Sequence, residues 1–211
     1  MKQKKKKGVE MAIVAGVTTV AFALASCNKE ETANTGGGTY DAEAVAEALY
    51  IVLKSDRKVY ASKIVNRLVK DEKVIKAHEE WEEEKALLLP AQFFREGAEE
   101  VEGVDDKPFE FSYSLQSSWP LNYENAKKKT PAVEEGLKEV SDPASDYYGK
   151  KWTSTEEIGG KEYFVGIYPD RAVAPACWEC HNNHENRKPE YPEFKKNDVM
   201  GGIVIRIPTG K

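Results

Sequence analysis

The chain has 211 residues, of which 40% are hydrophobic and 10% aromatic, and this composition is that of a folded domain with a sizeable core. Its formal net charge is −5, so the chain lacks the overall basic character of proteins that bind nucleic acids or anionic lipid surfaces. These values exclude a wholly disordered chain and predict no nucleic-acid partner.

The first 26 residues have the pattern of an export signal. Five lysines within residues 2–7 precede an apolar run from Met11 to Ala25, which is shorter than the ~20 residues needed to cross a bilayer. The sequence LASC at 24–27 resembles the lipobox of bacterial lipoproteins, in which the cysteine carries the lipid. We therefore expect lipidation of Cys27, and an ordinary secretory signal is the alternative.

A polar, glycine-rich stretch over residues 27–39 predicts a flexible tether, and residues 40–211 are expected to form one domain. Loss of residues 1–26, which contain five lysines and Glu10, changes the formal net charge from −5 to −9. These features predict a membrane-anchored lipoprotein that faces the periplasm or another extracytoplasmic space.

The folded part begins with a long amphipathic helix over residues 40–68. Apolar side chains recur there at helical spacing, namely at Leu49, Leu53, Tyr60, Ile64 and Leu68. Asp56 and Arg57 interrupt this apolar stripe. They are interpreted either as polar groups that face a buried ligand or as charges that reach water at the edge of the stripe.

The remaining elements alternate between helical and strand patterns. Helices are predicted over 72–88, which Pro90 closes, over 91–101 and over 124–140. Strands are predicted over 108–117, 161–169 and 198–208, the first of them with one buried face. This order favours an α+β domain with an antiparallel sheet.

The motif with the most specific chemistry is C-x-x-C-H at residues 177–181. In an exported protein this spacing is typical of c-type haem attachment, because two thiols on one turn can reach the two vinyl groups of the haem. Cys177 and Cys180 would then form thioethers, and His181 would be the proximal iron ligand. A redox-active cysteine pair and a zinc site that adds His184 are the alternatives. A single motif predicts a single covalent haem c.

The sixth iron ligand has several candidates. His78 lies in the predicted helix 72–88, Met200 in the last predicted strand and Tyr60 in the first helix. An open or water-bound position is a further possibility. His184 is too close to His181 along the chain to reach the opposite face, so it is interpreted as a contact to a haem propionate or to the surface.

Several separated segments resemble the DUF3365 family, also called the Tll0287-like haem domain. They are SDRKVYASKIVNRL, WEEEKALLLPAQFFREGAE, YFVGIYPDRAVAPACWECHNNHE and DVMGGIVIRIP, in the order of the family. The resemblance implies a PAS-like fold with one covalent haem c, attached at Cys177 and Cys180 and ligated by His181. Arg57 and Tyr60 are then expected in the haem pocket. Some members of the family use a distal cysteine, but the only spare cysteine here is Cys27 in the lipobox.

These features lead to two main functional hypotheses. The first is a lipid-anchored, extracytoplasmic monohaem cytochrome that transfers one electron at a time to a redox partner with a basic surface. The second is a haem-based redox or gas sensor that acts through a separate membrane partner. An enzyme is a third possibility, with His78 or the pair Asp56 and Arg57 as its distal acid–base groups.

Overall fold

The computed structural model describes residues 40–127 and 129–209. The export signal predicted over 1–26, the tether predicted over 27–39 and the lipidation site Cys27 lie outside the described residues.

A four-stranded antiparallel sheet forms the centre of the domain. Its strands are β1 (Ser112–Gln116), β2 (Trp152–Ile158), β3 (Lys161–Arg171) and β4 (Val199–Pro208), in the order β1-β4-β3-β2. The last strand of the chain is thus an inner strand, paired with β1 on one side and β3 on the other. The predicted α+β class with an antiparallel sheet in a single domain is confirmed.

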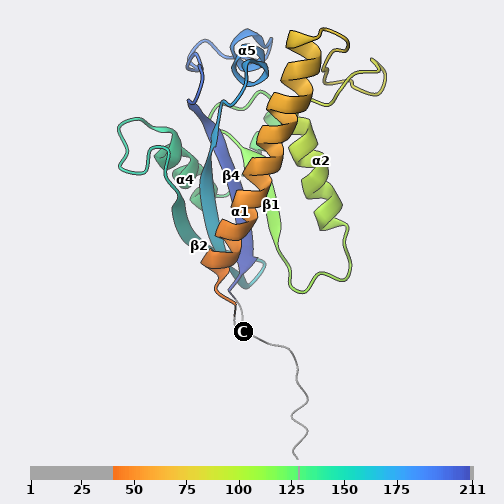
Figure 1. Ribbon diagram of the computed structural model, residues 1–211. Helices are drawn as coiled ribbons and strands as arrows, with labels where there is room; N and C mark the ends of the chain where they lie inside the picture. The colour runs from red at the N-terminus through yellow and green to blue at the C-terminus, as the bar shows by residue number, and fades with distance from the viewer. Residues whose placement is uncertain (1–39, 128, 210–211) are drawn as a thin grey trace, which may run out of the picture. The chain divides into compact units, whose positions relative to one another are not determined.

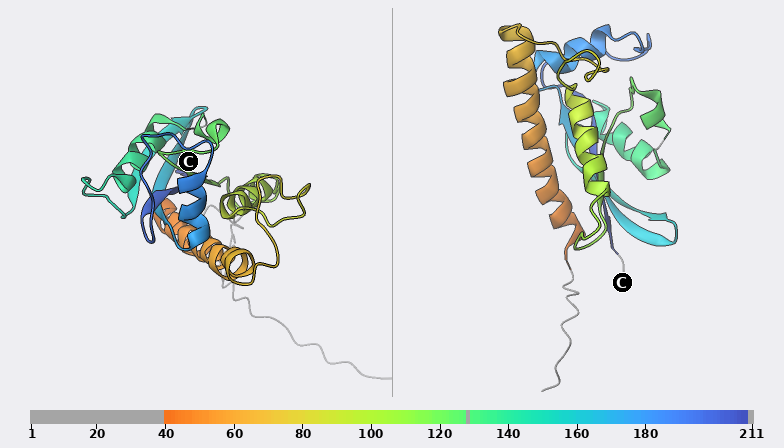
Figure 2. Two further views of the ribbon diagram at one scale, coloured as in Figure 1. Left: turned by 90° about the horizontal axis from the view of Figure 1, so that it is seen from above. Right: turned by 90° about the vertical axis from the view of Figure 1, so that its right-hand side faces the viewer.

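Helices cover both faces of the sheet. Figures 1 and 2 show α1 (Ala42–Val59) and α2 (Pro90–Glu102) on one face and α4 (Pro131–Ser141) on the other. Ile203, Ile205 and Ile207 of β4 pack on the side of α1 and α2, whereas Val204 packs against α4. Because both faces are covered, β3 and β4 are nearly continuous apolar runs rather than alternating ones.

The predicted first helix is confirmed and extends slightly further than expected. Asp41 caps its start, since the side-chain oxygen accepts hydrogen bonds from the backbone N–H groups of Glu43 and Ala44 at 3.0 and 3.2 Å. From Tyr60 the chain continues as a π-helix, η1 (Tyr60–Asp71). This long helix runs along the sheet, and its last part, η1, contacts α5 (Pro175–Asn183) (Figure 2).

The helix predicted over residues 72–88 is wrong. The chain leaves η1 through Lys73, whose φ is +56°, and then forms turns and a loop. A short parallel bridge joins Ala77 and Leu87 and closes the loop, with hydrogen bonds from His78 N to Leu87 O at 3.1 Å and from Leu87 N to Lys76 O at 2.9 Å. The acidic run Glu79–Glu84 places like charges at helical i, i+4 spacing, which opposes a helix.

The other predicted elements are present with changed bounds. The strand predicted over 108–117 is limited to β1, and the helix predicted over 124–140 is divided into α3 (Tyr123–Ala126) and α4. Thr130 caps the start of α4, since its hydroxyl accepts a hydrogen bond from Val133 N at 3.4 Å. Strand β2, which the sequence analysis missed, pairs with β3 through a turn at Gly159 and Gly160, both with positive φ.

Candidate functional site

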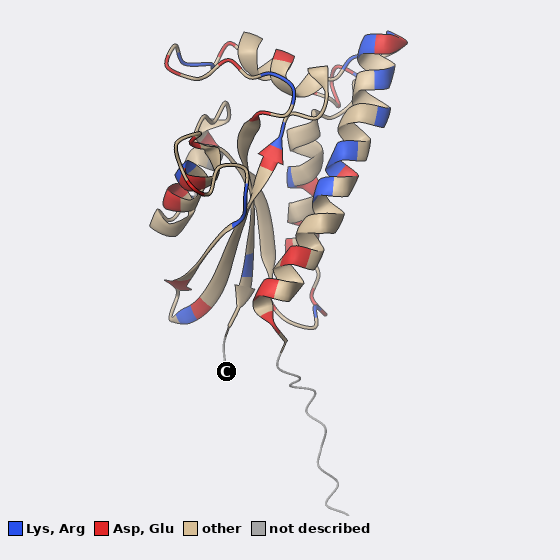
Figure 3. Cartoon of the chain, turned by 60° about the vertical axis from the view of Figure 1, so that its left-hand side comes forward, with Lys and Arg blue, Asp and Glu red and all other residues tan. Residues whose placement is uncertain are grey.

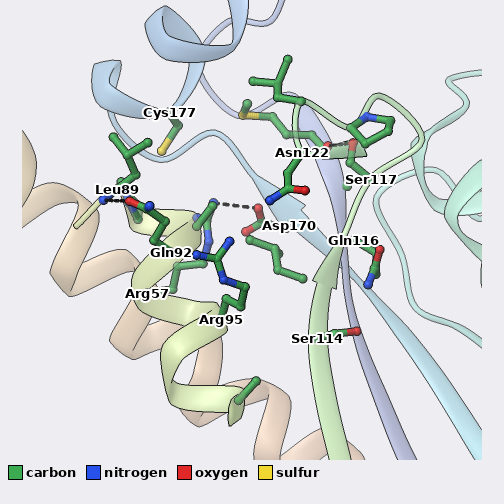
Figure 4. A pocket seen from close by; sticks show the side chains of 18 of the residues that line it. Arg57, Leu89, Gln92, Arg95, Ser114, Gln116, Ser117, Asn122, Asp170 and Cys177 are labelled. Carbon is green, nitrogen blue, oxygen red and sulfur yellow. Dashed lines mark hydrogen bonds and ion pairs between the residues drawn. The ribbon is translucent and has the colours of Figure 1, made fainter. Parts of the chain in front are cut away.

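A cavity lies between α5, α2, β1 and the loop that follows β1. Its volume is about 480 Å³, which falls in the usual range of about 300–1,000 Å³ for small-molecule and cofactor sites. Figure 4 shows its lining from close by, with Cys177 on α5, Gln92 and Arg95 on α2 and Gln116 on β1. The CxxCH helix and strand β1 thus both contribute to the lining of this cavity.

Helix α5 brings the three residues of the motif to this cavity. Pro175 is its first residue, as is common where a helix starts because the missing N–H would have no helical partner. Cys177, Cys180 and His181 are spaced i, i+3 and i+4, so they share a helix face, and all three line the cavity. Cys177 is 5% exposed, Cys180 is partly buried, and neither is in a disulfide with another described cysteine.

His181 is held in one orientation by a contact within its own helix. Its Nδ1 lies 3.1 Å from the backbone oxygen of Cys177, and because a carbonyl can only accept, Nδ1 carries the proton. The ring also meets Phe194 edge to face at a centroid distance of 5.9 Å. Burial lowers the pKa of His181 to about 4, so the ring is neutral at pH 7. Its Nε2 therefore keeps a free lone pair, which is the form that binds metals.

The two alternatives for the motif find little support in this geometry. Burial raises the pKa of Cys180, and Glu79 and Cys177 add to this effect, whereas a reactive redox thiol needs a lowered pKa. In the described ranges, no three His, Cys, Asp or Glu side chains gather in a way that could hold a metal ion, so the zinc alternative finds no ligand set there. A haem iron needs only one of these side chains on its proximal side.

Arg57 lies in the wall of the same cavity, although it belongs to the first helix. It is 6% exposed, and its Nη2 lies 2.9 Å from Oδ2 of Asp170 at the end of β3. Burial raises the pKa of Asp170, and the Arg57 guanidinium opposes that rise. Of the two interpretations of this stretch, Arg57 thus fits the polar group that faces a buried space, whereas Asp56 is exposed.

The structure does not bring Tyr60 and His78 to the cavity. The Tyr60 hydroxyl donates to the backbone oxygen of Leu88 at 2.9 Å, and its ring stacks on Phe93. His78 is exposed, and its Nδ1 accepts a hydrogen bond from Glu80 N at 3.1 Å. Neither belongs to the cavity lining, so a ligand role for either stays a prediction.

Met200 and His184 do line the cavity. Met200 is buried on β4 and packs in the apolar cluster that also contains Cys177. His184 Nε2 lies 2.9 Å from a carboxylate oxygen of Glu79, which connects the end of α5 to the loop after η1.

Sequence reasoning missed a polar part of the lining. It consists of Arg95 on α2 and of Ser112, Ser114 and Gln116 on β1. The alternation of the strand was visible in the sequence, and its polar face was available as a signal. Nothing near Arg95 in the sequence marks it as different from other helical arginines.

Among the described residues, no helix has both the length and the apolar character that a membrane crossing requires.

A family model matches most of the chain. The family model described as Tll0287-like: Tll0287 matches residues 39–208, a stretch that contains every described helix and strand as well as the cavity lining. Neither the curated proteins nor the solved structures gave a match.

Proposed function

Because the chain belongs to the Tll0287-like family, we propose that its domain is a monohaem c-type cytochrome that serves in one-electron transfer. Cys177 and Cys180 would hold the haem through thioether bonds, and His181 would be its proximal ligand. The bound group would supply a centre that takes up and releases single electrons.

One observation carries this proposal. The two thiols and a neutral imidazole project from one face of α5 into a cavity of about 480 Å³. The contact between His181 Nδ1 and the Cys177 oxygen, 3.1 Å long, fixes the tautomer that leaves Nε2 available. This donor set and this cavity support the proposal of a covalently attached, histidine-ligated haem.

The remaining residues would shield and orient the bound group. Leu89, Trp119 and Met200 supply apolar lining that excludes water, and a drier site strengthens electrostatic interactions within it. Arg57, fixed by Asp170, supplies a buried cation in the same wall.

We further propose that Cys27 anchors the protein by a lipid to a membrane that borders the periplasm. The expected charge of −9 after loss of residues 1–26 would attract a redox partner with a basic surface. Residues 27–39 would let the domain move relative to its anchor.

The first experiment is to mature the protein in a host that attaches haem c and to test for haem that survives denaturation. We expect the parent protein to gain the mass of one haem, and C177A and C180A each to lose a thioether. H181A is expected to change the absorption spectrum, because it removes the neutral imidazole from the cavity.

The matched control is H78A, since His78 is exposed and lies outside the cavity lining. Its spectrum should equal that of the parent. Absence of covalent haem in the parent protein would contradict the proposal, and a spectral change in H78A would make His78 the sixth ligand.

A sensor that acts through a separate membrane partner is the second candidate. The observation that favours it is that His78 and Tyr60, two of the candidates for the sixth iron ligand, lie outside the cavity lining, as an open sixth position would require. Carbon monoxide added to the reduced protein separates the two functions. A spectrum that does not respond supports electron transfer, and a saturable change supports sensing.

A further inference from the structure

Two of the guanidinium groups that line the cavity lie close to Asp170 (Figure 4). Arg57 comes from α1 and Arg95 from α2, and Figure 4 shows both beside Asp170. Arg206 also lines the cavity, but it is paired with Glu156 at 2.5 Å. Glu156 thus neutralises Arg206, and the question of which anions neutralise the cavity wall concerns Arg57 and Arg95.

Asp170 satisfies only part of this positive charge. It binds Nη2 of Arg57 at 2.9 Å, whereas Nε of the same guanidinium is buried and has no hydrogen-bond partner. A buried polar atom without a partner is unfavourable, because it has lost its water and gained nothing in exchange. Arg57 is thus incompletely satisfied by the protein alone.

Arg95 is held still more loosely. Its nearest carboxylates are those of Glu96 at 3.6 Å and Glu99 at 3.8 Å, both longer than the 2.7–2.9 Å of a charge-assisted hydrogen bond. Those two glutamates lie on its own helix, with side chains 46% and 60% exposed. Arg95 is therefore free to turn toward a partner inside the cavity.

The guanidinium groups themselves indicate the class of ligand. A guanidinium presents a planar fork of N–H donors that matches the two oxygens of a carboxylate. Ser112, Ser114 and Gln116 of β1 take no part, because they share the strand face of Val204 and Arg206, opposite to the face that α1 and α2 cover. Figure 4 shows Ser114 and Gln116 pointing away from the two arginines.

We propose that Arg57 and Arg95 form a receptor for carboxylate groups of the ligand that occupies the cavity. Two sources share this chemistry: the acidic side chains of the tetrapyrrole, in which case the inference rests on the proposed function, and a free small carboxylate. In the first case the two arginines are positioning residues that set the orientation of the tetrapyrrole relative to α5.

The test uses the haem-bearing protein and the variant R95Q. A carbodiimide and an amine are added to modify accessible carboxylates, and the haem peptide is then released by proteolysis and weighed. We expect the haem carboxylates of the parent to be protected and those of R95Q to react about tenfold faster or more. The double variant R57Q/D170N, which leaves no unpaired charge behind, should behave like R95Q.

The matched control is R67Q. Arg67 has a side chain that is 63% exposed and is paired with Glu72 at 2.6 Å, outside the cavity lining. This variant should keep the protection of the parent. It thus reports any general effect of losing one arginine.

Sodium acetate separates the two sources. If acetate raises the melting temperature of the haem-bearing parent above its value in sodium chloride at the same ionic strength, and R95Q does not respond, the receptor takes a free carboxylate. If R95Q matches R67Q in both measurements, the receptor is overturned. Failure of the proposed function is a different result, namely a parent protein without covalent haem, and the acetate test on that haem-free chain then decides the receptor alone.

Discussion

His181 shows how one side chain acquires its properties from its surroundings. Its place after Cys180 is a feature of the sequence, but its protonation state depends on burial and on a single backbone contact. The histidine could be named as a ligand candidate from the motif. Only the fold shows that Nδ1 carries the proton. Only the fold shows, too, that the pKa of the ring lies well below the usual pKa of a histidine.

The buried ring predicts a pH dependence for the stability of the haem-free chain. The unfolded chain takes up a proton at His181 near pH 6.5, whereas the folded chain does so only near pH 4. Between these values the unfolded state binds more protons, so the free energy of unfolding falls as the pH falls. Urea unfolding measured from pH 7 to pH 5 should show this loss.

The variant H181Q should show less of this loss, because its side chain does not titrate. H78A is the control, since an exposed histidine is expected to leave the slope as it is in the parent. Equal slopes in the parent and in H181Q would contradict the prediction.

At the scale of elements, patterns in the sequence correctly predicted the helices and strands whose formation depends on neighbouring residues. Unbroken apolar runs identified β3 and β4, and helical spacing identified the first helix. The pattern misled over residues 72–88, where repulsion among glutamates and the bridge from Ala77 to Leu87 outweigh helical spacing. Strand β2 was missed because its side chains are mostly polar, although Gly159 and Gly160 were a hairpin signal.

The residues of the site fall into the same two groups: those that a local motif identifies and those that only the fold brings together. Cys177, Cys180 and His181 are neighbours in the sequence, so a motif could identify them. Arg57 and Asp170 are more than a hundred residues apart, and only the packing of α1 against the sheet brings them together. No local pattern contains that information.

The contact of α4 with the sheet gives a prediction about stability. A Cβ at Gly136 would lie 2.4 Å from Cε3 of Trp152 and 2.5 Å from Cδ1 of Ile167. We expect G136A to lower the free energy of unfolding by about 1–3 kcal/mol, because overpacking outweighs the gain in helix propensity. Urea unfolding at neutral pH measures this change.

G103A is the matched control for that variant. Gly103 ends α2 with a φ of −75°, and a Cβ there would meet no atom closer than Glu100 O at 3.5 Å. Its effect should stay within about 0.5 kcal/mol. If G136A lowers the free energy of unfolding as little as G103A does, Trp152 moves aside and α4 is not tightly packed against the sheet.

At the scale of the whole molecule, charge is unevenly distributed. Figure 3 shows acidic residues near the start of α1 and mainly basic ones along the middle of the long helix. Lys54, Lys58 and Lys63 belong to this middle part, and all three are exposed. A partner with a basic surface would be repelled by this lysine-rich side despite the net negative charge of the chain. The distribution of charge therefore restricts the faces on which the proposed partner can dock.

The proposed anchor predicts where the protein is found in the cell. C27S should move the exported protein from the membrane fraction to the soluble fraction, because a serine cannot carry the thioether-linked lipid. Fractionation followed by mass analysis of the N-terminal peptide measures both effects. C177A is the cysteine control and should stay with the membrane, and a C27S protein that also stays there would contradict the anchor.

The position of β4 has a consequence for the order of events during folding. This strand is the last element of the chain, yet it lies between β1 and β3, so the sheet cannot close until residues 199–208 are in place. The segment that becomes α5 comes before it along the chain. Until residues 199–208 are in place, Cys177 and Cys180 belong to a chain whose core is incomplete. Under the proposed function, an enzyme that attaches haem to these cysteines would meet an extended substrate first, and the pairing of β4 would end that access.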